Sequence, residues 1–505
     1  MRRVMIPWSG GIRNATVGPW RLSLVAWEGS QVLPVANRSE SVDRGLLNTT
    51  MVMQHSGMDG NIPPLDLVCV GFDLTGIANA VALKERNGLS KDTLFLESQL
   101  EAFWKPLRST PASRLRISFL NDLITSENPR SPFTFLNYLH ATKRLILYAN
   151  SSQLRPSREM FSDYLRWCAT RLQAQVQYGK MVTSVQPLRD GKGDVAAWEV
   201  VFVDAVTGEQ NAVTAKQVVY AASNHPHVPK VLRAPALQTL VLHSSEYLQA
   251  IPTLLRDNPR ARIAVLGNGQ HAAEAFDQLH GIWGKHEVVW FTKDAVLRGD
   301  DETPFLLESI TLPNSPEAQT VPPEIRRRAV NAAAPVTSSS PIEPHLLRQI
   351  YDAQYDFSVK EKDPRMWRFQ IRFQHEVVHA ERMADGRVRL FVQSPENPNE
   401  PATFDAVICA TGVEKHAHYR ALEPLQALLD GPGITVDRDY HINFRKGVLA
   451  PGCGIWLQGS LVDGADQSDD SLLPTLAERS RRLAESVMHR RSEQTRSEEE
   501  RSARL

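Results

Sequence analysis

The sequence lacks any long uninterrupted hydrophobic stretch. Its longest apolar runs, such as residues 65–71, fall far short of the roughly 20 residues that span a bilayer. Near the N-terminus, Pro7, Ser9 and two glycines interrupt the apolar residues that follow a short basic start, so no secretory signal is predicted. We therefore expect a cytoplasmic protein with no membrane partner.

Cysteine is scarce. Only Cys69, Cys168, Cys409 and Cys453 occur, and they form neither a C-x-x-C nor a C-x4-C motif. This spacing predicts neither a metal site nor a disulfide framework, and it suits a reducing compartment. A disulfide reductase is one candidate class for this chain. That class needs a redox-active cysteine pair, and this sequence has no motif that would form one.

Net charge is absent as well. The 57 Lys and Arg residues balance the 57 Asp and Glu residues, and no basic stripe interleaved with aromatic side chains is present. Bulk charge therefore favours neither nucleic acid nor an anionic membrane surface as a partner. The length of 505 residues predicts two or three domains.

A glycine-containing motif stands at residues 262–274. Four apolar residues precede Gly267, an Ala-rich helical pattern follows Gly269, and a second strand is predicted at 288–291. In such a turn the first glycine makes the bend, the second admits a pyrophosphate, and small Ala272 lets the helix pack closely. The motif predicts a dinucleotide-binding turn, and an ordinary strand-to-helix turn is the alternative.

A similar pattern occurs earlier, at residues 65–80. The strand predicted after its helix ends in Glu97, where a ribose hydroxyl is usually held. However, Asp73 occupies the second glycine position. Its carboxylate would face a pyrophosphate there, which is an electrostatic conflict.

The two motifs predict an α/β fold with two Rossmann-like dinucleotide-binding domains and a small substrate-binding region between them. Alternating segments at 198–203 and 217–222 predict a small antiparallel sheet beside the first domain. Residues 311–345 have the composition of a long loop or lid. Further helices are predicted at 156–167 and 345–355, further strands near 369 and at 387–392, 404–412 and 454–459.

Two cations follow the strand predicted after the second turn. Lys293 and Arg298 lie where the 2′-phosphate of a nucleotide would bind, and no acidic residue ends that strand. The pattern therefore favours NADPH over NADH. Two solvated surface cations remain the alternative.

Several longer motifs carry a family resemblance that covers residues 65 to about 485. They lie at residues 117–123, 131–139, 156–167, 243–247, 265–274, 410–412, 454–458 and 470–473. Their order resembles that of the N-hydroxylating flavoprotein monooxygenases, the ornithine N5- and lysine N6-hydroxylases of siderophore biosynthesis. The resemblance implies FAD and NADPH as cofactors, and O2 and a small-molecule amine as substrates. The flavin then carries the chemistry, so no side chain acts as a catalytic acid or base.

The resemblance also implies a domain plan, with self-association left open. Residues 1–63 are an N-terminal extension and 486–505 a charged flexible tail. Residues 64–242 and 396–485 make the FAD domain, and 243–395 make the NADPH domain with a lid or substrate insertion at about 300–365. The implied FAD residues are Gly71, Asp73, Gly76, Glu97, Gly412, Ser471 and Leu472; the NADPH residues are Gly267, Gly269, Gln270, Ala272, Glu274 and Lys293; the substrate residues are Arg114 and Leu307.

The sequence departs from the family pattern around the flavin. Asp73, Arg108, Asn224 and Asp466 replace a glycine, an apolar residue and two positions of cofactor-contacting motifs. Leu307 also replaces an amide that usually binds the substrate head group, which argues against free ornithine. Two hypotheses follow: an active monooxygenase with a different amine substrate, or a diverged relative with impaired FAD binding.

Overall fold

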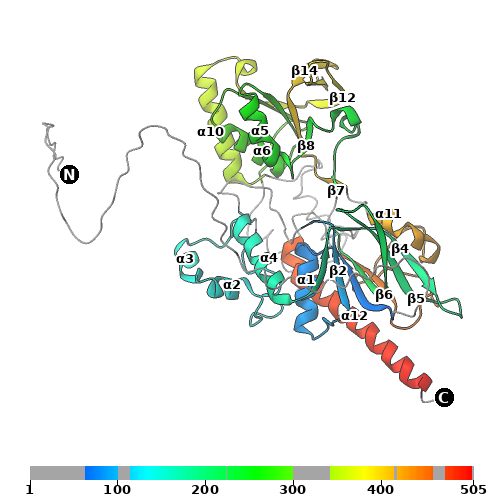
Figure 1. The fold of residues 1–505 in the computed structure, drawn as a ribbon. Helices are drawn as coiled ribbons and strands as arrows, with labels where there is room; N and C mark the ends of the chain where they lie inside the picture. Colours follow the sequence, from blue (N-terminus) through cyan, green and yellow to red (C-terminus); the bar gives the residue numbers. More distant parts are fainter. Residues whose placement is uncertain are drawn as a thin grey trace, which may run out of the picture. The chain divides into compact units, whose positions relative to one another are not determined.

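The computed structural model describes residues 63–100, 114–115, 117–222, 225–299, 342–414, 418–458 and 472–502, all within the compact unit Gly57–Leu505. The predicted N-terminal extension lies almost wholly outside these residues. Two separate sheets, each with a core of parallel strands, organise the described chain (Figure 1). Among the described helices, none combines the length and the hydropathy needed to cross a membrane.

The first sheet has seven strands in the order β3-β2-β1-β6-β5-β4, with β17 also paired to β6. Strands β1, β2, β3, β6 and β17 are parallel, and β4 and β5 form an antiparallel extension. The bounds are β1 (Leu65–Val70), β2 (Thr93–Glu97), β3 (Gln175–Tyr178), β4 (Lys180–Arg189), β5 (Val195–Asp204), β6 (Gln210–Tyr220) and β17 (Gly454–Leu457).

The predicted separate antiparallel sheet is therefore part of this larger one. The first half of β6 pairs with β5, and its second half pairs with β1 on one side and β17 on the other. One long strand thus carries both the antiparallel extension and the parallel core. Sequence alternation cannot reveal this arrangement, because β17 is distant in the chain.

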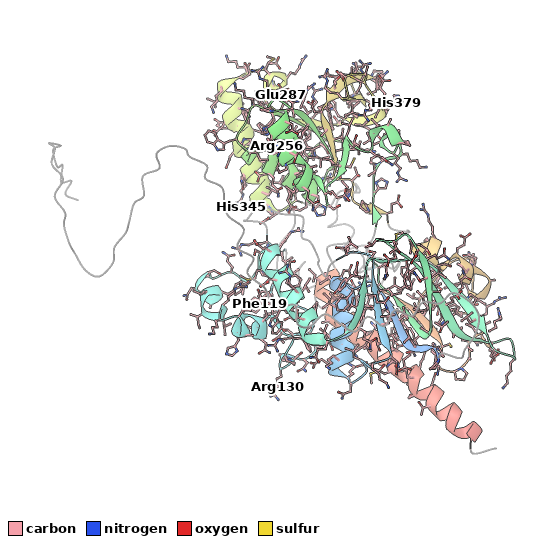
Figure 2. All side chains as sticks on the ribbon, in the orientation of Figure 1. Phe119, Arg130, Arg256, Glu287, His345 and His379 are labelled. Carbon is pink, nitrogen blue, oxygen red and sulfur yellow. The ribbon has the colours of Figure 1, made fainter. Side chains whose placement is uncertain are left out.

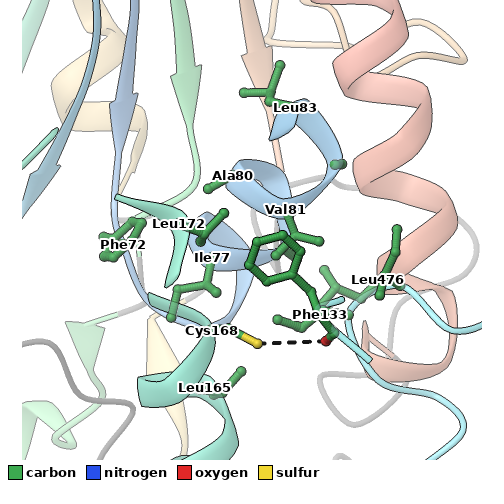
Figure 3. Packing of buried hydrophobic residues seen from close by; sticks show 14 of the residues in the cluster. Phe72, Ile77, Ala80, Val81, Leu83, Phe133, Leu165, Cys168, Leu172 and Leu476 are labelled. Atoms are coloured by element: carbon green, nitrogen blue, oxygen red, sulfur yellow. Dashed lines mark hydrogen bonds between the residues drawn. The ribbon is translucent and has the colours of Figure 1, made fainter. Parts of the chain in front are cut away.

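Three helices cover one face of the first sheet: α1 (Leu74–Glu85), α4 (Arg158–Leu172) and α12 (Leu472–Ser502). Helix α1 is buried almost all round because it contacts the sheet, α4 and α12. Its Ile77, Ala80 and Val81 pack with Leu165 of α4 and Leu476 of α12 in one hydrophobic core (Figure 3). This packing holds the N-terminus of α1 at the carboxyl end of β1.

Helix α12 extends well into the segment predicted to be a flexible tail. Gln217, fully buried in β6, donates from Nε2 to the carbonyl of Val487 at 3.0 Å and accepts from Arg491 Nε at 3.1 Å. Arg491 also donates to the carbonyl of Gly88 at 2.8 Å. The prediction of a flexible tail from residue 486 is thus corrected. Hydrogen bonds to Gln217 and Gly88 hold a helix whose charged and polar composition suggested a solvent-exposed segment.

We predict that Arg491→Met destabilises the fold. The substitution leaves the side-chain oxygen of Gln217 and the carbonyl of Gly88 without this donor, at a cost of about 1 to 3 kcal/mol. Urea unfolding measures the change. His489→Ala on the exposed side of α12 is the control and should stay within about 0.5 kcal/mol of the natural protein. Equal effects of the two changes would contradict the assignment.

Short helices α2 (Phe135–Ala141) and α3 (Leu145–Asn150) surround an aromatic cluster beside α4. Phe119, labelled in Figure 2, has its ring centroid 5.9 Å from that of Phe135 and 5.8 Å from that of Tyr148. Buried Asp122 accepts the N–H of Phe135 at 2.6 Å and so fixes the start of α2. Burial nevertheless raises the pKa of Asp122 above its ordinary value.

The other face of the first sheet has its own hydrophobic core. Fully buried Trp198 of β5 stacks on Phe444 at 5.7 Å, and Leu422, Leu425 and Leu428 pack in the same cluster. Those leucines come from α11 (His418–Leu422) and the 3-10 turn η4 (Glu423–Leu428). With both faces covered, β2 is buried throughout and β1 is buried from Leu67 onward, as is usual for parallel strands.

The second sheet is wholly parallel, in the order β11-β10-β9-β15-β8. One hydrophobic core joins it to α5, α6 and α10. The bounds are β8 (Val241–His243), α5 (Tyr247–Asp257), β9 (Arg262–Leu266), α6 (Gln270–Gly281), β10 (Glu287–Thr292), α10 (Pro344–Lys360), β11 (Phe369–Phe373) and β15 (Ala406–Cys409). The two parallel sheets confirm the predicted fold class.

The opposite face of the second sheet packs on a three-stranded antiparallel sheet and two 3-10 turns. These elements are β12 (Glu376–Arg382), β13 (Val388–Gln393), β14 (Glu400–Phe404), η1 (Lys230–Leu232) and η2 (Pro235–Leu237). The turn η3 (Pro364–Met366) leads into β11, and β7 (His225–Pro226) pairs with β16 (Val413–Glu414).

Two predicted boundaries need correction. The chain does not leave the second domain at residue 396, because β15 inserts between β8 and β9. The predicted lid is also shorter at its C-terminal end, because Ile342, Leu346 and Ile350 pack in the second core. In both places a nonlocal contact sets the boundary.

Candidate functional site

The candidate site consists of two glycine turns at the carboxyl ends of parallel strands. One follows β1 and the other follows β9, and each leads directly into a helix. Ligands of open α/β sheets bind at this end, where strand carboxyl ends and helix N-termini meet. The sequence correctly placed both turns.

The second turn requires glycine at its first position. Gly267 has φ +144°, and a Cβ there would collide with the carbonyl oxygen of Ala410, the residue directly after neighbouring β15. The same Cβ would lie 3.3 Å from the Cβ of Ala272, so the helix also needs a small residue. These contacts give Gly267 and Ala272 the roles expected in a dinucleotide turn.

The helix after this turn begins without a side-chain cap. Gly269 is the N-cap residue of α6, with φ −117° and ψ −168°, and no side chain there accepts from the first-turn N–H groups. The helix dipole and these N–H groups suit an anion. The second turn therefore fits the pyrophosphate of a nicotinamide dinucleotide.

Lys293 follows β10, beside the second turn. Its side chain is 67% exposed, and its Nζ lies 2.6 Å from Glu376 Oε1. Next to it, Asp294 accepts from the amide of Asn268 in the turn at 3.1 Å. Lys293 can therefore reach a ligand at this edge, but Glu376 competes with such a ligand for the Lys293 ammonium group.

We predict that Lys293→Ala weakens NADPH binding by about 1 to 3 kcal/mol and leaves NADH binding nearly unchanged, because the lost bond is to the 2′-phosphate. Glu376→Gln should have the opposite sign, strengthening NADPH binding by up to about 1 kcal/mol as the competing ion pair is removed. Calorimetric titration measures both constants. Equal losses for NADPH and NADH in Lys293→Ala would show that Lys293 does not contact the phosphate.

Gln270 and Glu274 both contact other protein groups. Gln270 donates from Nε2 to Glu274 Oε1 at 2.9 Å and accepts the N–H of Glu343 at 2.8 Å. Glu274 also lies 3.6 Å from Nη2 of Arg158 in α4. The sequence predicts both residues as NADPH ligands. It does not identify Arg158, because the pattern of that helix indicates only a face that packs in the core.

The first turn retains the backbone geometry of a dinucleotide site. Gly71 has φ +98°, and a Cβ there would lie 2.6 Å from the carbonyl oxygen of Ala221, the residue directly after β6. A Cβ at Gly76 would collide with the carbonyl oxygen of Gly71. The first turn therefore demands both glycines, as the second turn demands Gly267.

Glu97 ends β2 beside the first turn. Its Oε2 accepts the N–H of Phe72 at 2.6 Å, and its Oε1 accepts the N–H of Gln99 at 2.8 Å. These two bonds orient a nearly buried carboxylate at the strand end. The position and chemistry fit the hydroxyl of a nucleotide ribose.

Asp73 makes the first turn different from the second. It is the N-cap residue of α1, and its Oδ1 accepts the N–H groups of Thr75 at 3.1 Å and Gly76 at 3.4 Å. Aspartate is a favourable cap because it satisfies such N–H groups. The same groups would meet a pyrophosphate, so the carboxylate occupies the place of the anion. Among the described residues, Asp73 is the position whose side chain conflicts with FAD.

We predict that Asp73→Gly raises FAD affinity by about 1 to 3 kcal/mol, since the competing charge is removed from the helix N-terminus. The lost cap should cost only a few tenths of a kcal/mol of stability. Asp73→Asn is the matched control, because it keeps a capping oxygen and removes only the charge. Bound FAD per chain is measured after gel filtration, and a saturated natural protein would contradict the prediction.

Three other candidate residues lie among the described residues. Gly412 follows β15 with φ +78°, and its carbonyl accepts the N–H of His227 at 2.9 Å. Arg114 donates to the carbonyl of Arg155 at 2.9 Å. Leu472 begins α12. The remaining predicted positions lie outside the described residues: Arg108, Asn224, Leu307, Asp466 and Ser471.

His243 was missed as a site residue, although its motif contributed to the resemblance. It ends β8, with Nδ1 2.8 Å from Ser245 Oγ and Nε2 3.0 Å from the carbonyl oxygen of Gly412. Burial lowers the pKa of His243 below its ordinary value. The residue thus ties the end of β8 to the segment after β15, and a histidine directly after an apolar strand is the signal that could have revealed it.

Fold and site together define a protein with two dinucleotide-binding domains. Residues 63–415 match the family described as L-lysine 6-monooxygenase/L-ornithine 5-monooxygenase. The chain is 33% identical to the L-ornithine N(5)-monooxygenase of Ajellomyces capsulatus over 432 residues, covering 84% of this chain and 90% of the relative. The chain belongs to this monooxygenase family.

Solved structures agree with the assignment. The ornithine hydroxylase of Pseudomonas aeruginosa has a TM-score of 0.74 at 30% identity, and 85% of this chain and 100% of that one are covered. The ornithine N-hydroxylase of Kutzneria sp. 744, in a structure with reduced FAD, NADP+ and L-ornithine, has a TM-score of 0.72 at 28% identity, with coverages of 85% and 100%.

Proposed function

We propose that the chain is an N-hydroxylating monooxygenase that uses FAD, NADPH and O2 to convert a small primary amine into a hydroxylamine. The observation that carries the proposal is the second turn, where Gly267 packs against Ala410 and the N-terminus of α6 has no side-chain cap. Membership of the lysine and ornithine monooxygenase family supports the reaction class.

The reaction consumes one amine, one O2, one NADPH and one proton, and it yields a hydroxylamine, water and NADP+. FAD, when bound, would supply the activation of O2 with reducing equivalents from NADPH. The chain supplies binding and orientation. The first turn of α6 would hold the NADPH pyrophosphate, Lys293 its 2′-phosphate, and Glu97 the ribose of FAD.

A second candidate function is a diverged relative that binds NADPH but retains FAD poorly. The cap that Asp73 places on α1 favours this candidate, because α6 has no such competitor. The visible spectrum of the purified protein separates the two. A flavin band that is released on denaturation supports the first candidate, and a colourless protein that cannot be reconstituted supports the second.

The amine substrate is proposed to differ from free ornithine, because Leu307 stands where the family has a head-group amide. The proposals about location and partners are the same as in the sequence analysis. We propose a cytoplasmic enzyme without nucleic-acid or membrane partners, and self-association is left open.

We predict that free ornithine and lysine stimulate NADPH oxidation without matching hydroxylation. NADPH loss and hydroxylamine product are measured together in FAD-supplemented protein, with diamines and ornithine derivatives tested in parallel. Leu307→Asn is the matched variant and should improve the ratio of product to NADPH for ornithine, since it restores a hydrogen-bonding amide. Coupled hydroxylation of free ornithine by the natural protein would overturn the substrate proposal.

A further inference from the structure

A chain of polar contacts joins α4 to the helix that follows the second turn. Arg158, the first residue of α4, lies 3.6 Å through Nη2 from Oε1 of Glu274 in α6. The same oxygen accepts from Gln270 Nε2 at 2.9 Å, and the carbonyl oxygen of the Gln270 side chain accepts the N–H of Glu343 at 2.8 Å. Three segments distant in sequence thus meet behind the second turn.

The ion pair in this chain is buried. The side chain of Glu274 is 5% exposed, and that of Arg158 is 14% exposed. A charge in such a place is tolerated only with a partner, because burial removes its hydration. Arg158 is therefore a counter-ion that stabilises the Glu274 carboxylate.

The location of Glu274 is electrostatically unfavourable for a nucleotide site. The residue is five positions after Gly269, about 7 Å along the helix axis, and helical side chains tilt toward the N-terminus. An unpaired carboxylate there would repel a pyrophosphate at the start of α6 and oppose the helix dipole. Its neutralisation by Arg158 removes this penalty.

We propose that Arg158 and Glu274 are a charge-compensating, positioning pair for NADPH, and that neither residue is a nucleotide ligand. The inference rests on the proposed function, since it assumes that NADPH binds at the second turn. Gln270 belongs to the same unit, because both ends of its amide hold protein groups. Arg158, from a helix that packs on the first sheet, thereby becomes a determinant of affinity at the second turn.

The test is calorimetric titration of the full-length protein with NADPH at two salt concentrations, well below the thermal midpoint of every variant. Arg158→Met leaves Glu274 uncompensated and should raise the Kd about tenfold, more at low salt. Glu274→Gln should change the Kd by less than about twofold. The double variant Arg158→Met/Glu274→Gln should return the Kd to within about threefold of the natural protein, because no charge remains unpaired.

Arg166→Met is the matched control, because Arg166 lies on the same helix and pairs with exposed Asp163. Should Arg158→Met fold poorly, Arg158→Gln in the Glu274→Gln background supplies the neutral pair. A raised Kd in Glu274→Gln alone would make Glu274 a ligand, and a double variant as weak as Arg158→Met would make Arg158 a direct phosphate contact. An unchanged Kd with a lower thermal midpoint would leave only a structural role. Each of these three results overturns the proposal, whereas a natural protein that binds no NADPH overturns the proposed function as well.

Discussion

Both dinucleotide turns depend on the close approach of a glycine backbone to the carbonyl that directly follows a neighbouring strand. Gly71 abuts Ala221, and Gly267 abuts Ala410, with no room for a Cβ in either place. This approach brings each helix N-terminus to the carboxyl edge of its sheet, where a phosphate can meet free N–H groups. Both candidate cofactor sites depend on these two contacts.

Two turns with the same backbone nevertheless differ in charge. At α6 the helix dipole faces the ligand position without a side-chain cap, whereas at α1 the carboxylate of Asp73 already accepts two N–H groups. Asp73 therefore caps its own helix, and this cap lowers the affinity of the helix N-terminus for an external anion. A single side chain can thus weaken the binding of a cofactor while the fold is retained.

The sequence predicted what local pattern controls. Both turns, the strands around them and the conflict at Asp73 follow from residue spacing and charge, and the longer motifs indicated the family. Nonlocal pairing was beyond such reasoning. β6 also pairs with distant β17, buried Gln217 bonds the carbonyl of Val487 in α12, and Arg158, which pairs with Glu274, lies on another helix. Each of these depends on a contact between segments far apart in the chain.

The hydrogen bond from Gln217 to Val487 spans 270 positions, and Arg491 reaches back to Gly88. During synthesis strands β1 to β6 and helix α1 therefore emerge long before α12, the helix that covers them. The second sheet, whose strands lie between residues 241 and 409, can close while the first still exposes apolar α1. Contacts of such long range slow folding and prolong the exposure of aggregation-prone apolar surface. The first domain is therefore synthesised first but completes its folding last.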